Sequence, residues 1–252
     1  MRRRNFLNDA AEQLAVDYRC TLHDFFRSEN KVTVSEYVQG QRRITEAPVY
    51  FRGVTMGRNA VMTVHPCLFD FADSIADSDG LRLFDGKGLA AINNELYRHG
   101  HYIGMIGQCY IPSADFAPLD MCGWHIEIFD EEQIKRQLYP YYSGYENALL
   151  YHSGVRKDVL AACAISGSTV LGMAGASNDS DRFHQIGVDV LPEFRGKGLG
   201  PVLVSVLANE LLSMGKIPYY ETWPGNISSH RTAVKSGFVS AWTEIFSMEL
   251  PK

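Results

Sequence analysis

The chain has 252 residues, of which 46% are hydrophobic and 21% charged, a composition typical of a globular protein with a sizeable core. Its formal net charge of −5 excludes the basic footprint of a nucleic-acid-binding protein. No apolar stretch reaches the roughly 20 residues of a membrane span, and a polar segment follows the arginines at positions 2–4, so we expect a cytoplasmic protein.

The first half of the chain predicts a mixed α/β domain. Helices are expected at residues 8–18, 21–27, 68–77 and 89–99, and strands on both sides of a turn at 56–59 and over 102–111. Thr21 and Asp24 are spaced to form a capping box at the start of the second helix. Pro112 and Pro118 mark a connector, so we expect a smaller N-terminal α/β domain over 1–120 and a second domain over 121–252.

The second half is more regular. Strands are expected at residues 123–130, 158–165, 169–177, 183–190 and 216–223, with one or two more over 238–250. Helices are expected at 130–139, from a glycine-rich loop to Met214, and at 226–236. Gly215 is placed to end the middle helix as its C-cap.

Two segments of the chain are similar to each other. Residues 86–103 and 196–220 both contain GKGL and then NEL, with a glycine four residues after that leucine. The echo favours a first half that is a degenerate copy of the second. The alternative is a separate binding domain in front of the second half.

The cysteines and histidines predict neither a disulfide framework nor a metal site. The five cysteines, at positions 20, 67, 109, 122 and 163, are scattered and form no CxxC pair, which is typical of free thiols. His99 and His101 are the closest histidine pair, whereas a structural metal site needs four ligands at tight spacing. We therefore expect no bound metal.

A glycine-rich loop, VLPEFRGKGLGP at residues 190–201, joins a predicted strand to a predicted helix. Loops of this kind bring backbone N–H groups to an anion, and the helix dipole adds attraction. The loop lacks the Ser or Thr that follows the lysine of a Walker A sequence, and its GxGxG does not follow the strand directly, as a dinucleotide fingerprint does. Both of those nucleotide-binding motifs are therefore excluded.

The loop resembles the acetyl-CoA loop of the GNAT N-acetyltransferase superfamily. Val190, Pro192, Arg195, Gly198 and Gly200 match the family signature in register. The stretch NISSHRTAVKSGF at 226–238 is similar to the family's second motif. The resemblance spans roughly residues 122–252 and implies an α/β (α+β) fold with a mixed, splayed central sheet flanked by helices.

By this resemblance acetyl-CoA is the co-substrate, and its pyrophosphate is held by backbone N–H groups of Arg195, Gly196, Lys197, Gly198, Leu199 and Gly200. The pantetheine arm would run beside Val188 and Val190, where the sheet splays, and a backbone N–H near Val190 would polarise the thioester carbonyl. Asn226 and Ser229 would contact the cofactor from the other side. Further candidates for the nucleotide phosphates are the side chains of Lys197, Arg231 and Lys235.

The catalytic residues stay open at this point. The family often places a tyrosine, as general acid, four residues before the glycine of the second motif, and this chain has Ala233 there. The alternatives for the acid are Tyr219, Tyr220 and His230. The candidates for the base that deprotonates the acceptor are His184, Asp189 and Glu221.

These features predict an N-acetyltransferase that moves an acetyl group from acetyl-CoA to an amine of a small molecule or peptide. Direct attack in a ternary complex is expected, because no Cys or Ser lies in a nucleophile motif. The alternative is a non-catalytic acyl-CoA-binding sensor or interaction protein, which Ala233 permits. Nucleic acid and membrane partners are not expected, and a homodimer stays open. A hypothesis for the acceptor site is an aromatic, cation-binding cleft of Tyr142, Tyr219, Tyr220 and Trp223.

Overall fold

The computed structural model describes residues 5–45, 47–77, 80–141, 143–151 and 153–251. Within these residues the strands form one mixed sheet of ten strands, in the order β1-β3-β2-β10-β4-β9-β8-β7-β6-β5. The first half of the chain supplies β1 (Lys31–Val34), β2 (Phe51–Thr55), β3 (Val61–Val64) and β4 (His101–Pro112). The second half supplies β5 (Ile126–Asp130), β6 (Asp158–Ser166), β7 (Thr169–Asn178), β8 (Phe183–Val190), β9 (Ile217–Thr222) and β10 (Phe238–Glu249).

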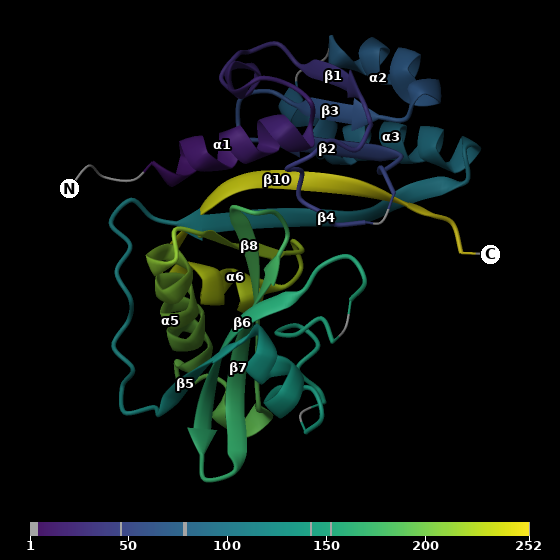
Figure 1. The fold of residues 1–252 in the computed structure, drawn as a ribbon. Coiled ribbons are helices and arrows are strands. Elements are labelled where there is room, and N and C mark those ends of the chain that lie inside the picture. The colour runs from purple at the N-terminus through teal and green to yellow at the C-terminus, as the bar shows by residue number, and fades with distance from the viewer. Residues whose placement is uncertain (1–4, 46, 78–79, 142, 152, 252) are drawn as a thin grey trace.

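Helices flank this sheet, as the sequence predicts for a mixed α/β fold. They are α1 (Phe6–Asp17), α2 (Phe69–Ala76), α3 (Gly86–Arg98), the single turn α4 (Glu131–Gln133), α5 (Leu199–Ser213) and α6 (Ile227–Lys235). In Figure 1, α1, α2 and α3 lie with β1–β3 in the upper part of the molecule, and α5 and α6 lie with β5–β8 in the lower part. None of the described helices is both long and apolar enough to cross a membrane.

Strand β10 lies between β2 and β4 and crosses the middle of the molecule (Figure 1). Ile245 of β10 pairs with Gly53 of β2 on one side and with Ile106 of β4 on the other. β4 pairs in turn with β9, where Cys109 lies opposite Glu221. The sheet therefore runs without a break from the first half into the second, and the domain division at residue 120 remains a prediction.

Helix α5 packs on the second half of the sheet. Leu203, Leu207 and Leu211 are fully buried, and their spacing of four residues puts them on one face of the helix. Gly215, with a φ angle of +74°, follows the last turn, as predicted. This packing holds the first turn of α5 near the end of β8.

Strands β8 and β9 separate toward their C-terminal ends. Their parallel pairing starts at the beginning of both strands and stops at Ile186 and Tyr220. β8 continues to Val190, paired there with β7. Over residues 187–190, β8 has no pairing with β9 in the described part of the chain, and this separation is the predicted splay of the sheet.

The predicted helices and strands are confirmed with a few differences. Residues 21–27 form only a 3-10 turn, Leu22–Phe25, with the predicted capping box, because so short a segment does not nucleate an α-helix. The strand β1 is not predicted from the sequence, because its four residues gain their pairing from the distant β3. The helix expected at 130–139 begins as α4 and continues as a π-helical turn, Ile134–Leu138.

Candidate active site

The loop before α5 presents its backbone. Gly196 and Gly198 have φ angles of +75° and +84°, a left-handed conformation that favours glycine. The Nε of Arg195 donates to the carbonyl oxygen of Val190 at 2.9 Å and closes the base of the loop. Gly198 is the N-cap of α5, and no side chain of the described residues caps this helix start. The N–H groups of the first turn are therefore available to an anion.

The loop opens onto a cleft of about 870 Å³ where β8 and β9 separate. The walls of the cleft come from the end of β8, the loop, the end of β9, α6 and the segment 146–150. The predicted site residues that line it are Val188, Asp189, Val190, Arg195, Gly196, Gly198, Leu199, Gly200, Tyr220, Glu221, Asn226 and Ser229. The fold thus brings both predicted motifs and three of the catalytic candidates into one cavity.

Lys197 and His184 are two of the predicted residues that are not among the described residues that line the cleft. Lys197 places its Nζ 5.2 Å from the centre of the Phe194 ring. His184 is buried at the start of β8, and this burial lowers its pKa. His184 is therefore away from the cavity that holds the other candidates.

The hypothesis of an aromatic cleft is only partly met by the described residues. Tyr220 and Trp223 line the cavity, and Trp223 is exposed. Tyr219, on β9, is fully buried against Phe183 and Trp242 instead of facing the cavity. Tyr142 lies outside the described residues.

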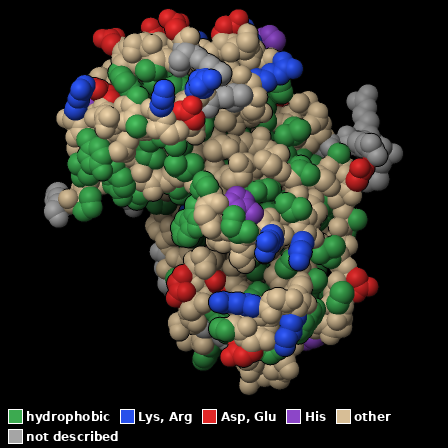
Figure 2. All heavy atoms as spheres, turned by 180° about the vertical axis from the view of Figure 1, so that it is seen from behind, with side chains coloured by type: hydrophobic (Ala, Val, Ile, Leu, Met, Phe, Trp, Pro, Cys, Tyr) green, Lys and Arg blue, Asp and Glu red, His purple; other side chains and the backbone are tan. Residues whose placement is uncertain are grey.

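Positive side chains gather where the loop meets α6. Arg195 from the loop and Arg231 and Lys235 from α6 line the cleft and are exposed. Figure 2 shows Lys and Arg side chains on the lower half of the rear face of the molecule. A positive rim beside the first turn of α5 suits the phosphates of an anionic ligand.

Glu221, on β9, is a half-buried carboxylate of the cleft, and its Oε1 is fully buried. Burial, together with the nearby charge of Glu244, raises its pKa to about 7. Its Oε2 accepts a hydrogen bond from the Nε2 of Gln185 at 3.2 Å, and no described residue bonds its Oε1. A Cβ atom on Gly107 would lie 2.0 Å from this Oε1, so the glycine leaves the space that the carboxylate occupies. Glu221 therefore changes its protonation near neutral pH.

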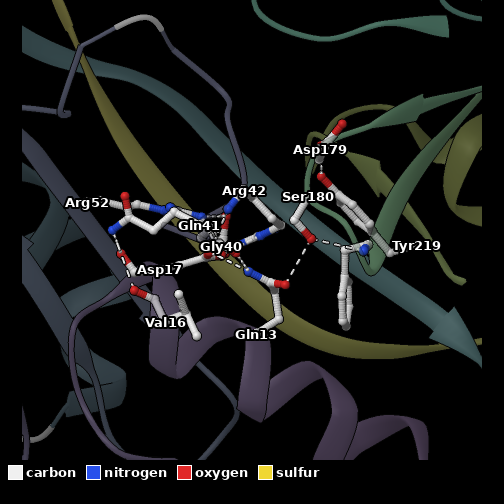
Figure 3. A network of polar contacts seen from close by, with 12 residues as sticks. Gln13, Val16, Asp17, Gly40, Gln41, Arg42, Arg52, Asp179, Ser180 and Tyr219 are labelled. Atoms are coloured by element: carbon white, nitrogen blue, oxygen red, sulfur yellow. Dashed lines mark hydrogen bonds and ion pairs between the residues drawn. The ribbon is translucent and has the colours of Figure 1, made fainter. Parts of the chain in front are cut away.

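A buried ion network lies between the first half of the chain and β9. Arg42 pairs with Asp17 and with Glu244, and Arg52 contacts the same two carboxylates at 3.4 and 3.3 Å. All four side chains are buried, and their charges cancel. Figure 3 shows Arg42 between the end of α1 and Tyr219. Residues far from the loop in sequence thus set the electrostatic surroundings of Glu221.

Gln185, the hydrogen-bond partner of Glu221, is held by Arg156. The Nη1 of Arg156 donates to the Oε1 of Gln185 at 2.6 Å and pairs with Asp179 at 3.0 Å. Both Gln185 and Arg156 line the cleft. Sequence reasoning missed them, because one glutamine or arginine on a strand belongs to no motif. The alternation in FHQIGVDV, which puts Gln185 on the opposite face from Ile186, is the only signal that the sequence carries for it.

Asp189 holds one wall of the cleft. Its carboxylate accepts hydrogen bonds from the backbone N–H groups of Asn147 and Ala148, at 2.8 and 3.0 Å, and from the Asn147 side chain at 2.6 Å. This segment crosses the sheet over Gly175 and Gly187, where a Cβ atom would lie 1.9 and 1.6 Å from its carbonyl oxygens. The carboxylate of Asp189 is thus engaged in three hydrogen bonds within the protein.

Among the candidates for a general acid, Tyr220 lines the cleft. Its hydroxyl lies 2.6 Å from the Oγ of Ser229, and burial raises its pKa. The Nδ1 of His230 lies 2.6 Å from the hydroxyl of Tyr110, and neither residue is among the described residues that line the cleft. Ala233, where the resemblance implies a tyrosine, is buried in the core.

Comparisons with known proteins point to one family. Residues 119–238 match the model of the acetyltransferase (GNAT) family. A GCN5-related N-acetyltransferase from Kribbella flavida is similar in structure, with a TM-score of 0.50 and 16% identity over 98% of this chain and 96% of that protein. The corresponding protein from Sphaerobacter thermophilus has a TM-score of 0.48 and 12% identity over 96% of this chain and 92% of its own. The comparison with curated proteins gives no match. The likeness to the Kribbella protein shows that the fold of the whole chain, first half included, occurs in a solved structure.

Proposed function

Because residues 119–238 match the model of the acetyltransferase (GNAT) family, we propose that the protein is an N-acetyltransferase that moves an acetyl group from acetyl-CoA to an amine. The observation that carries this proposal is one cleft that joins the glycine-rich loop to the half-buried carboxylate of Glu221. A binding site for an anionic nucleotide and a base of raised pKa then face the same space. Attack by the amine in a ternary complex needs both.

The residues of the loop fit the phosphates of acetyl-CoA. Gly196 and Gly198 keep side chains away from the first turn of α5, whose N–H groups suit a pyrophosphate. Arg195, Arg231 and Lys235 add positive charge at the rim of the cleft. Over 187–190, the edge of β8 that faces away from β7 pairs with no strand of the described residues, so it suits the amide groups of the pantetheine arm, with Asn226 and Ser229 on the opposite wall.

Glu221 is the general base in this proposal. An amine with a pKa near 10 arrives protonated, so a group must take its proton before it attacks the thioester. Glu221 has a pKa of about 7, and its Oε1 is buried without a partner among the described residues. Gln185 and Gly107 fix the position of this carboxylate from two sides.

Tyr220 is the proposed donor of a proton to the departing thiolate. Its raised pKa keeps the phenol protonated at neutral pH, and Ser229 orients its hydroxyl. The role is modest, because a thiol of pKa about 8.5 is a tolerable leaving group without help. A backbone N–H near Val190 would stabilise the oxyanion that forms on the acetyl carbonyl, worth about 3 kcal/mol.

The proposal is tested by acetyl-CoA turnover against a panel of polyamines, amino acids, aminoglycosides and peptides with free N-termini. Release of CoA thiol that depends on one class of amine, with an acetylated product of the expected mass, is the predicted result. A parallel calorimetric titration measures the binding of acetyl-CoA alone. Tight binding without amine-dependent release would favour the acyl-CoA sensor, and absence of binding would remove the proposed role of the loop.

A further inference from the structure

The first half of the chain holds a cluster of nucleophilic and titratable side chains outside the cleft. It consists of Tyr50, His65, Cys67, His99 and His101, and we name it the Cys67 cluster. The Sγ of Cys67 lies 2.7 Å from the hydroxyl of Tyr50 and 3.0 Å from the Nδ1 of His65. The Nδ1 of His99 lies 3.8 Å from the same sulfur. The thiol is exposed, so reagents reach it from solvent.

The residues of the Cys67 cluster come from separate elements that the fold brings together. Tyr50 directly precedes β2, His65 follows β3, and His99 and His101 lie on either side of the junction between α3 and β4. The ring of Tyr50 stacks on His65 at 4.7 Å and on His101 at 3.9 Å. The packing of these rings fixes both the phenol and the imidazole at the sulfur.

The neighbours of Cys67 are suited to a thiolate. Burial and the hydrogen bond to Cys67 raise the pKa of Tyr50 to about 12, so Tyr50 remains a phenol and donates to the sulfur. The Nδ1 of His65, 3.0 Å from the sulfur, lies within reach of the thiol proton. The Nε2 of His99 lies 3.4 Å from the Oε1 of Glu95. Glu249 is a further charged group beside the cluster, and its negative charge opposes the lowering of the His101 pKa by burial.

The other cysteines lack this environment. Cys109 and Cys163 are buried, which raises their pKa, to about 12 for Cys163. Burial also raises the pKa of Cys20 to about 12. Cys122 is exposed like Cys67, but the described structure gives its sulfur no histidine or tyrosine partner. Cys122 is therefore a matched internal control.

We propose that Cys67 is a reactive thiol that is modified by low-molecular-weight disulfides and other soft electrophiles. The Cys67 thiolate attacks one sulfur of the disulfide, the new bond joins Sγ to that sulfur, and the old S–S bond breaks. The second sulfur leaves as a thiolate and takes up a proton, while the thiol proton of Cys67 passes to His65. The disulfide is the oxidant and is reduced to one thiol and one mixed disulfide.

This site is independent of the proposed acetyl transfer. No residue of the Cys67 cluster is among the described residues that line the cleft. His101 begins β4, and Cys109, eight residues later, is the residue that pairs with Glu221. At about 3.3 Å per residue the cluster lies roughly 26 Å from that pairing. Modification of Cys67 and turnover of acetyl-CoA can therefore be measured separately.

The test is the rate at which each cysteine of the full chain reacts with oxidised glutathione at about pH 6.5, read by intact mass and by peptide mapping. An ordinary thiol, of pKa about 8.5, is roughly 1% ionised there. We expect Cys67 to react at least about tenfold faster than Cys122 in the same molecules. Cys67→Ser removes the fast phase, and Cys122→Ser keeps it. Acetyl-CoA turnover is unchanged in both.

His65→Asn and His99→Asn locate the origin of the reactivity, with the exposed His23→Asn as the control. We expect the two cluster variants to slow Cys67 several-fold, and His23→Asn to leave its rate unchanged. Equal rates for Cys67 and Cys122 in the wild-type chain would overturn the proposal, whatever the variants do. Unchanged rates in both cluster variants would also overturn it.

Discussion

Glu221 meets two opposing demands. Burial favours the neutral form of a carboxyl group, whereas a base for an amine must be ionised. A pKa of about 7 leaves both forms populated near neutral pH. The single hydrogen bond from Gln185 orients the group without fully stabilising its charge.

Glu221→Gln keeps the shape of the side chain and removes the base, so we expect kcat/KM to fall about a hundredfold or more. The same substitution should raise the free energy of unfolding above that of wild type at a pH above about 7. The pKa is about 7 in the folded chain against 4.5 without the protein environment. The stabilisation from the neutral form is thus complete below about pH 4.5 and is lost as the pH rises through about 7.

Urea unfolding at about pH 5 and about pH 8 measures this effect. Wild type should lose stability relative to Glu221→Gln between the two, by up to about 3 kcal/mol. The same unfolding free-energy difference at both pH values would contradict the raised pKa of Glu221.

Glu244 acts on Glu221 through charge, because its carboxylate raises the pKa of Glu221. In Glu244→Gln that repulsion disappears, and we expect the acidic limb of the rate-pH profile to move to lower pH. The variant also loses a partner of Arg42 and Arg52, so its free energy of unfolding falls. The rate-pH profile is therefore recorded on protein that has been shown to be folded. Glu249→Gln, on the exposed end of β10, is the matched control. An equal shift of the acidic limb in both variants would show that Glu244 does not set the pKa of Glu221.

At the scale of elements, the start of α5 depends on left-handed glycines. Gly198 and Gly215 bracket this helix with φ angles of +84° and +74°, and only Gly198 lines the cleft. Alanine at either position costs about 1–2 kcal/mol of stability. We expect Gly198→Ala to raise the KM for acetyl-CoA about tenfold, because the loop N–H groups shift, and Gly215→Ala to leave it unchanged. Steady-state kinetics at saturating amine checks this, and an equal KM in both variants would count against the loop.

The loop and its helix are predictable from the sequence because the information is local. The glycine spacing, the strand before it and the apolar face of α5 lie within 32 consecutive residues, 183–214. Asn226 is likewise found from its motif, and its side chain caps α6. In such segments the backbone conformation and the binding group are specified by the same few residues.

The surroundings of Glu221 are not predictable in this way. Its pKa depends on Glu244, which is brought near by the pairing of β10 with β4, and its space depends on Gly107, which is brought near by the pairing of β4 with β9. Such pairing is set by packing between distant strands, for which a single sequence has no periodic signal. The sequence therefore names Glu221 as one of three bases and cannot rank them, and the choice among them remains a proposal.

At the scale of the whole molecule, β10 couples the two halves. Ile245 of β10 pairs with β2 and β4 and is buried in a cluster whose other buried members all come from the first half, so its contacts tie the last strand of the second half to the first half. We expect Ile245→Ala to cost about 2–5 kcal/mol and to lower the protection of both parts of the sheet together. Hydrogen exchange of β2–β3 and of β7–β8 measures this.

Val239→Ala, at an exposed position of the same strand, is the control and should change stability by less than about 1 kcal/mol. Faster exchange in only one half of the Ile245→Ala variant would show that the two halves unfold separately.

The position of β10 also affects the order in which the sheet is completed during synthesis. β10 leaves the ribosome after the other nine described strands of this sheet, yet it fills the gap between β2 and β4. Until it arrives, two central strands have open edges that are able to pair with other chains. Pairings between residues near 53 and 245 are also slow to form, because a long loop must close first. A chain that stops shortly before Phe238 would keep the loop at 195–200 and α6, and would still be exposed to aggregation at its centre.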